Sequence, residues 1–211
     1  MSDAQNDKGT KDRILDSAEH LFAKDGYKGT SMRAITGKAG VNLASVNYHF
    51  GTKQALLDAV IKRRIVPLNK IRKQRLEDVQ RKAQEAGKKA DVSSLLRAFI
   101  EPTLKFMASG PGARDFIAFI GRSIYDPDDT VRNIFHRYIR SLFNLFFAMM
   151  SEALPKLKKD VLFWRIHFAI GSMQHTMRLC GTNFKELEQF NTDTDTLTEY
   201  LLEFITEGVK A

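Results

Sequence analysis

Apolar side chains recur every three or four positions along nearly the whole of this 211-residue chain. The first segment shows the spacing, because Ile14, Leu15, Ala18 and Phe22 fall on one face of a helix. Glycine or proline marks the interruptions, and the sequence has no strand-like alternation, internal repeat or heptad seam. A chain with this period and only five prolines is predicted to fold as an all-α protein of about nine helices.

Capping residues and helix breakers set the expected boundaries. Thr10 is the expected N-cap of the first helix, and Gly26 is its expected stop. Pro67 falls inside the long fourth helix, where it removes a backbone donor and predicts a kink or break. The polar stretch 80–89 is the predicted linker after that helix. The predicted helices are 11–25, 32–39, 43–49, a fourth that begins at Lys53, 91–108, 112–124, 128–153, 158–180 and 194–208.

Two short helices joined by a tight turn are predicted near the N-terminus. Segments 32–39 and 43–49 are separated by Gly40, Val41 and Asn42. Gly40 permits the left-handed backbone that a sharp turn requires, and Val41 can fill the angle between the helices. Two short helices joined in this way form the helix-turn-helix pattern of DNA-binding proteins.

The segment that contains this pattern resembles a known family. Residues 13–53 read RILDSAEHLFAKDGYKGTSMRAITGKAGVNLASVNYHFGTK, with an AxxLFxxxGY opening, a KAGV turn and a YHFGxK close. These marks resemble the DNA-binding domain of the TetR-type transcriptional regulators. The resemblance implies a DNA-binding domain over 1–53 and a ligand-binding and dimerisation domain over 54–211. The VNLAxVNYHFGxK pattern and the FWRxHFxxG stretch at 163–171 are most similar to the fatty-acid-responsive, PsrA-like subgroup.

The second short helix carries side chains suited to a recognition helix. Small or polar groups at its N-terminus can reach base edges in the major groove. Leu43 or Ala44 can meet a thymine methyl group, and Asn47 can pair with a base or a phosphate. Hydroxyl and cationic groups on either side suit phosphate oxygens, and the family pattern places Tyr48 on a phosphate. The predicted DNA-contacting residues are Thr30, Ser31, Arg33, Asn42, Leu43, Ala44, Ser45, Asn47, Tyr48, His49, Thr52 and Lys53.

The net charge of +8 is concentrated in one stretch. Residues 61–90 contain eleven basic and three acidic side chains, whereas residues 1–60 carry a net +1 and residues 91–211 a net −1. A basic stretch suggests DNA or an anionic membrane surface as a partner, and a solvated helix face is the alternative. The resemblance implies a helix that leads away from DNA, so we interpret these residues mainly as a solvated face.

Phenylalanine and methionine are frequent in the C-terminal two-thirds of the chain. Such residues usually form core, but they also line adaptable apolar cavities. The resemblance implies an effector pocket in this domain, and the composition then predicts a small, largely apolar ligand such as a fatty acid or an acyl-CoA. Its binding is expected to shift the fourth helix, with Pro67 as the pivot, and to release the DNA. The predicted ligand-binding residues are Phe106, Met107, Phe116, Ile120, Phe143, Phe146, Phe147, Met150, Phe163, His167, Ile170 and Gln174. Further candidate partners for an acidic headgroup, each of which has an ordinary surface or core role as its alternative, are Arg122, Arg165, His175 and Arg178.

The segment 158–180 is apolar almost all round, so it must be covered on both sides. One side can face the effector pocket and the other a second subunit, and Gly171 permits close helix approach. Segment 194–208 carries a matching stripe made of Leu197, Leu201, Ile205 and Val209. The resemblance implies a homodimer through these two helices, and its twofold symmetry suits a palindromic operator in double-stranded DNA.

Other classes of protein find less support in the sequence. It contains no Walker motif, HExxH, GxSxG or GxGxxG, so we predict no enzymatic activity, no cofactor and no metal site. The single cysteine, Cys180, is expected to be a buried apolar residue and fits a reducing compartment. The polar N-terminus and the lack of a long apolar window predict a cytoplasmic protein without stable membrane insertion. The open alternative is a lipid-binding carrier or membrane-surface protein, which would not need residues 42–53.

Overall fold

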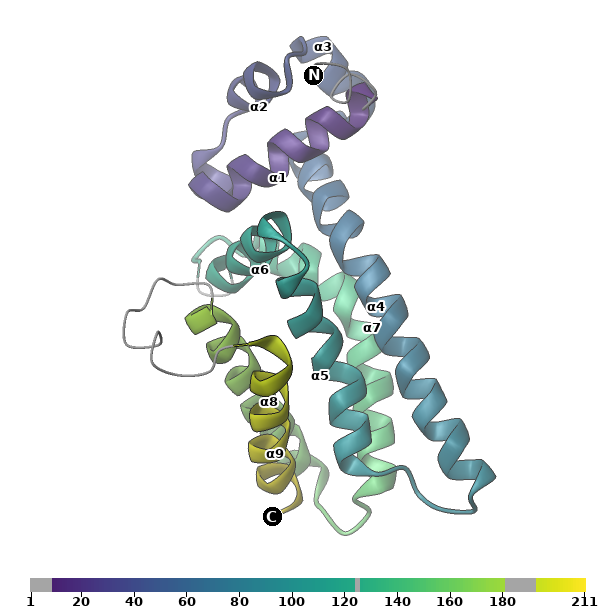
Figure 1. The fold of residues 1–211 in the computed structure, drawn as a ribbon. Coiled ribbons are helices and arrows are strands. Elements are labelled where there is room, and N and C mark those ends of the chain that lie inside the picture. The colour runs from purple at the N-terminus through teal and green to yellow at the C-terminus, as the bar shows by residue number, and fades with distance from the viewer. Residues whose placement is uncertain (1–8, 124–125, 181–192) are drawn as a thin grey trace, which may run out of the picture. The chain divides into compact units, whose positions relative to one another are not determined.

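The computed structural model describes residues 9–123, 126–180 and 193–211. Helix is the one regular element within these ranges, so the predicted all-α fold is confirmed. Figure 1 shows the helices found there, which are α1 Thr10–Gly29, α2 Met32–Ala39, α3 Leu43–Phe50, α4 Lys53–Glu85, α5 Val92–Ala108, α6 Pro111–Ser123, α7 Thr130–Ala153, α8 Lys159–Cys180 and α9 Thr194–Lys210.

Local capping explains where the two short helices begin and end. The Ser31 side chain accepts a hydrogen bond from the Ala34 amide at 3.1 Å and so begins α2. Asn42 begins α3 in the same way, since it accepts from the Ser45 amide at 2.8 Å. Gly40 adopts a φ of 63° and ends α2 with the left-handed turn that the sequence predicts.

α1 differs from the prediction at both ends. Its N-cap is Gly9, which offers no side-chain acceptor, so Thr10 is the first helical residue and not the cap. Gly26 adopts a φ of 74°, yet the helix continues beyond it to Gly29. The Thr30 hydroxyl donates to the Gly26 carbonyl at 2.8 Å and secures this last turn. The regular helix is therefore interrupted at Gly26, where the sequence predicts its stop, and a further turn beyond the kink extends α1 to Gly29.

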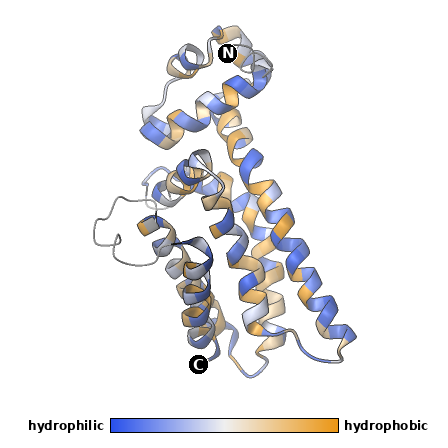
Figure 2. Ribbon diagram, viewed as in Figure 1, coloured by the Kyte–Doolittle hydropathy of each residue, from blue (hydrophilic) through white to orange (hydrophobic). Residues whose placement is uncertain are grey.

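α4 runs through Pro67 as one helix, so a break is absent, and a kink at this residue stays a prediction. Pro67 lies on an exposed side of the helix, where one missing backbone donor costs less than it would in a buried position. The predicted linker at 80–89 is wrong over its first half, because Arg81 pairs with Asp78 and with Glu85 at 3.1 Å each and supports the last helical turns. Figure 2 shows hydrophilic and hydrophobic residues interleaved along α4, as expected for a helix with one buried side.

The described residues form two compact units. The first contains those up to Ile65 together with Arg114–Tyr138. The second contains Val66–Ala113 together with the described residues from Ile139 onward. α4 contributes to both units, and the units alternate along the chain. The sequence predicts two domains that meet at one boundary, between residues 53 and 54. The two compact units do not test that boundary, because each unit combines separate stretches of the chain, so the boundary stays a prediction.

The first unit has a small core to which each short helix contributes an anchor. Ile35 of α2, Val46 of α3 and Phe22 of α1 are all fully buried. The Phe22 ring stacks on Phe119 of α6 with centroids 6.1 Å apart. Because α2 and α3 are only two turns long, these buried side chains and the caps fix their directions.

The second unit is a helical bundle in which α9 packs on α5 and α8. The rings of Phe99 in α5 and Phe146 in α7 stack with centroids 4.4 Å apart. Leu201 and Ile205 of α9 are buried in this core. Cys180 is the last residue of α8, and its side chain lies outside the part of the chain that the structure describes.

Candidate nucleic-acid interface

α3 is anchored by one buried side chain and presents most of the others to solvent. Val46 is fully buried, whereas Leu43, Ala44 and Asn47 are exposed and Tyr48 is 86% exposed. An exposed face of small, amide and aromatic groups on a short, firmly anchored helix can enter a DNA major groove. The predicted recognition face is therefore accessible on the surface of the first unit.

Asn42 and Ser45 hold the start of α3. The Asn42 Oδ1 atom accepts hydrogen bonds from the Ser45 amide at 2.8 Å and from the Ser45 hydroxyl at 2.9 Å. These bonds fix the direction in which the helix leaves the turn. Asn42 and Ser45 thereby position the exposed side chains of Leu43, Ala44 and Asn47.

The three predicted phosphate-binding hydroxyl groups lie in different environments. Thr30 is 2% exposed, and its hydroxyl donates to the carbonyls of Leu21 at 3.1 Å and Gly26 at 2.8 Å. This corrects the prediction for Thr30, which supports the end of α1 from inside the unit. Ser31 and Thr52 are exposed at the N-termini of α2 and α4, where their oxygens accept bonds from the first helical turns. Helix N-termini of this kind favour phosphate oxygens.

Lys53 occupies the first position of α4, directly after α3. Its ammonium group lies 4.4 Å from the centroid of the Tyr27 ring, which limits the directions in which the side chain can point. Burial lowers the pKa of Lys53, and the negative charge of Asp128 opposes that change. Of the other predicted cationic contacts, Arg33 on α2 is exposed and His49 at the end of α3 is partly exposed. The first unit thus offers cations beside both short helices.

Two arginines of the basic stretch tie α4 to α1. The Arg63 guanidinium pairs with Asp16 at 2.7 Å and with Glu19, and Arg64 Nε pairs with the same Glu19 carboxylate at 2.7 Å. Glu19 is buried. Burial acts to lower the pKa of Arg63, but hydrogen bonds and charge from Glu19 and then Asp16 outweigh it and raise that pKa. These two arginines are therefore structural, and the solvated-face interpretation is wrong for them.

Other basic residues between 61 and 90 include both arginines that are paired or buried and lysines that are exposed. Arg75 pairs with Glu101 at 3.2 Å, and Arg72 is buried within the second unit. Lys62, Lys70 and Lys73 are exposed, as expected of a solvated face. The sequence thus predicts the environment of these lysines correctly and misses that of the arginines, because only the fold supplies their partners.

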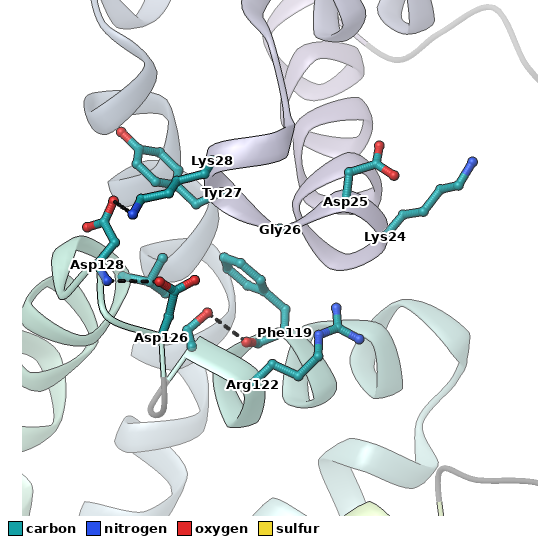
Figure 3. A pocket seen from close by; sticks show the side chains of 11 residues that line it. Lys24, Asp25, Gly26, Tyr27, Lys28, Phe119, Arg122, Asp126 and Asp128 are labelled. Carbon is teal, nitrogen blue, oxygen red and sulfur yellow. Dashed lines mark hydrogen bonds and ion pairs between the residues drawn. The ribbon is translucent and has the colours of Figure 1, made fainter.

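A hollow of about 270 Å³ lies within the first unit, at the Gly26 kink of α1 (Figure 3). Arg122 of α6 reaches across and donates to the Ala23 carbonyl, and Lys28 pairs with Asp128 at 3.7 Å. Six of the eleven residues that line this hollow are charged, so its lining does not suit a purely apolar ligand. Arg122 is a candidate headgroup partner in the sequence, but here it fixes α6 to α1.

The predicted effector residues are distributed between core and surface. Phe116, Phe146 and Met150 are almost fully buried, and Met107 and Ile120 are nearly so. Phe106, Phe143, Phe147, Ile170 and Gln174 are partly buried, while Phe163 and His167 are exposed on α8. None of these twelve residues lines the hollow at Gly26 or a second hollow of about 440 Å³ at the end of α4. The effector site therefore stays a prediction.

α8 and α9 each carry exposed aromatic side chains, and we call these side chains together the aromatic face. Trp164 and Phe168 of α8 are 58% and 67% exposed, and Tyr200 and Phe204 of α9 are exposed to a similar degree. An apolar surface of this kind is unusual on a monomer and commonly marks an interface. The sequence prediction named the α9 stripe that includes Leu201, Ile205 and Val209, but those three side chains point into the bundle. The sequence does not identify Tyr200 and Phe204 as outward residues. Because α9 carries apolar residues on both sides, its pattern alone does not show which side faces solvent.

Two kinds of feature are absent from the described residues. No helix among them is both long enough and apolar enough to span a membrane. Within the same ranges, no cluster of three or more histidine, cysteine or acidic side chains has the geometry to hold a metal ion.

Comparison with protein-family models gives two matches that together cover most of the chain. Residues 14–60 match the family described as bacterial regulatory proteins, tetR family. Residues 97–208 match the tetracyclin repressor-like C-terminal domain. The second match alone covers more than half of the 211 residues.

Individual relatives are similar over much of their length. The probable HTH-type transcriptional regulator YttP of Bacillus subtilis is 23% identical over 143 residues, which span 68% of this chain and 64% of that protein. NalD of Pseudomonas aeruginosa, the secondary repressor of the MexAB-OprM multidrug efflux pump, superposes with a TM-score of 0.67 at 22% identity, covering 94% of both chains. The regulator FadR of Bacillus subtilis, solved in complex with stearoyl-CoA, gives a TM-score of 0.60 at 17% identity, covering 93% of this chain and 97% of that one. At these identities the two structures support the fold alone.

Proposed function

This chain belongs to the TetR family of bacterial transcriptional regulators, and from that premise we propose that it is a cytoplasmic repressor released from DNA by a small, largely apolar ligand. In this proposal a homodimer binds a palindromic operator. The observation that carries it is the exposed face of α3, with Val46 buried beneath and Asn42 capping the helix start. A lipid carrier would not require such a face.

The accessible side chains suggest a division of roles on DNA. Leu43, Ala44 and Asn47 lie on the face of α3 that can approach base edges. Exposed hydroxyl, cationic and phenolic groups surround them and are proposed to bind phosphates. This phosphate-binding set consists of Ser31, Arg33, Tyr48, His49, Thr52 and Lys53.

Paired substitutions test this division. Lys53→Ala is expected to weaken binding to all duplexes alike and to reduce the slope of log affinity against log salt by about one, because one phosphate contact is lost. Asn47→Ala is expected to relax the preference at one operator position by about 1–3 kcal/mol, because a base contact is lost. Fluorescence anisotropy with the operator and single-base variants at several salt concentrations measures both effects. An unchanged preference in Asn47→Ala would reassign this residue to phosphate binding or structure.

Dimerisation is proposed to occur through the aromatic face of α8 and α9. A twofold axis would repeat the face on both subunits, and such self-complementary contacts are typical of homodimers. The same axis would hold two α3 helices about 34–36 Å apart, the separation of successive major grooves on one side of DNA. A dimer of this kind requires a palindromic operator.

The proposed effector class is a fatty acid or an acyl-CoA. Partly buried rings and buried methionines in α5, α7 and α8 can rearrange around an aliphatic chain. The stearoyl-CoA complex of FadR provides a precedent for this ligand class on the same fold. The effector must bind the released state more tightly, by about 1–3 kcal/mol for a typical coupling.

Pro67 is the proposed pivot of the switch. α4 is continuous and leaves the first unit between Ile65 and Val66, next to this proline. Pro67→Ala restores a backbone donor and stiffens the helix, so it is expected to change the effector concentration needed for half-release by several-fold. Operator affinity without effector should stay at the wild-type value. Titrations of the operator complex with effector test this, with Val66→Ala as the control, and a wild-type release curve for Pro67→Ala would exclude the pivot.

A further inference from the structure

Arg72 is a buried cation in the second unit. It lies on the inner side of α4 and is 4% exposed. Its Nη1 atom donates to Asn69 Oδ1 at 3.1 Å, and Nη2 donates to the Thr103 hydroxyl oxygen of α5. The guanidinium carbon lies 5.1 Å from the centroid of the Phe99 ring. Both hydrogen-bond acceptors are neutral.

The described part of the chain supplies this cation with no carboxylate partner. The acid that lies close in sequence to Thr103, Glu101, is engaged by Arg75 and Lys105. Burial alone lowers the pKa of Arg72, to about 10, so the side chain still carries its charge near neutral pH. A buried charge without a counter-ion destabilises a fold, and proteins keep one mainly where a function requires it.

One edge of the guanidinium is only partly hydrogen-bonded. Nε is buried and has no hydrogen-bond partner, and Nη2, on the same edge, bonds only to the Thr103 hydroxyl among the described residues. Two parallel N–H groups on one edge match the two oxygens of a carboxylate. The surroundings are apolar, since the Phe99 ring beneath the guanidinium stacks on Phe146.

We propose that Arg72 binds the carboxylate of the effector, whose hydrocarbon chain packs against Phe99, Phe146 and the neighbouring apolar side chains of α5 and α7. This inference rests on the proposed function, and it narrows the effector to a free carboxylic acid. The carboxylate replaces the Thr103 hydroxyl on the Nε and Nη2 edge and supplies the missing counter-ion. An acyl-CoA has a neutral thioester at the end of its acyl chain and so offers no carboxylate to this edge of the guanidinium.

Binding of three probes to the full-length protein tests the inference without DNA. Oleate, methyl oleate and oleoyl-CoA share one hydrocarbon chain and differ at its end. Isothermal titration calorimetry below the micellar concentration is expected to show oleate binding about 10- to 100-fold more tightly than methyl oleate, because only the acid forms charge-assisted hydrogen bonds. Oleoyl-CoA is expected to bind no better than the ester. Equal affinity for acid and ester, tighter binding of oleoyl-CoA, or no oleate binding overturns the proposal.

Two variants assign the preference to this side chain. Arg72→Met is expected to reduce the preference for the acid to within about twofold. Its melting temperature without ligand should not fall below wild type, because an apolar residue of similar length removes an uncompensated charge. Arg75→Met, which removes a partly exposed arginine one turn away, should keep the preference. If Arg72→Met retains the preference, the carboxylate binds elsewhere and the proposal fails. If Arg72→Met does not fold, Arg72→Lys is the deciding variant. It keeps the positive charge and should keep a reduced preference for the acid over the ester. Equal affinity of Arg72→Lys for acid and ester overturns the proposal.

The same preparations separate this inference from the proposed function. Operator binding without ligand is measured in parallel for each protein. Specific operator binding without discrimination between acid and ester leaves the regulator in place and overturns the role of Arg72. Arg72-dependent oleate binding without any specific operator binding supports the carboxylate site and overturns the proposed function.

Discussion

Glu19→Gln is expected to lower the free energy of unfolding of the first unit by about 2–3 kcal/mol. The buried Glu19 carboxylate is shared by Arg63 and Arg64, so its neutralisation leaves two guanidinium groups without their principal counter-ion. The loss is smaller than for a fully buried pair, because both arginines are partly exposed and water compensates some of the charge. Chemical denaturation followed by circular dichroism measures the change, and operator binding should weaken with it.

Asp16→Asn is the matched control for this experiment. Asp16 lies on the same helix, contacts Arg63 at 2.7 Å and is more exposed than Glu19. Its removal is expected to cost no more than about 1 kcal/mol. Equal losses for the two variants would mean that burial does not distinguish these carboxylates, and would contradict the structural role assigned to Arg64.

Placing two charges on the aromatic face is expected to produce a monomer. Trp164→Glu combined with Phe168→Glu puts like charges on a surface that a twofold axis would bring against its own copy, where their desolvation is costly. Operator affinity should fall about 100-fold or more, because two linked half-site contacts become independent. Analytical ultracentrifugation gives the oligomeric state, and anisotropy gives the affinity.

Ile71→Glu controls for the general effect of an added surface charge. Ile71 is an exposed apolar residue of α4 and lies outside the aromatic face. This variant should remain dimeric and bind the operator normally. A dimeric Trp164→Glu, Phe168→Glu protein would place the subunit interface on another surface.

Most helices could be predicted from the sequence because their signals are local. Met32–Ala39 begins and ends where a serine and a glycine provide capping within one turn, and Asn42 starts the next helix by the same chemistry. The periodicity of α7 and α8 similarly gave their boundaries to within two residues. Gly26 shows the limit of this reasoning, since it interrupts the regular helix as predicted but one further turn follows it to Gly29, and the sequence alone does not predict that turn.

The candidate site could be predicted only in part, for a related reason. Exposure of Leu43, Ala44 and Asn47 follows from the helical period of α3. The buried positions of Thr30 and Arg72 do not follow from any local pattern. Thr30 bonds to the Leu21 carbonyl of α1, and Arg72 bonds to Thr103 of α5, so both depend on how the chain folds back. In the sequence Arg72 is one basic residue among eleven between 61 and 90. Only its partners across 31 residues of chain distinguish it.

Recognition of a specific DNA sequence is the property on which the proposed regulator depends. The direct measurement is the affinity of the purified protein for duplex DNA from its own promoter and for a scrambled duplex of the same composition, over a range of salt concentrations. We predict that affinity falls steeply with salt for both duplexes, and that the promoter binds at least about 1,000-fold more tightly than the scrambled duplex at physiological salt. Equal affinity for the two duplexes at every salt concentration would contradict sequence-specific recognition and favour a lipid carrier or membrane-surface protein.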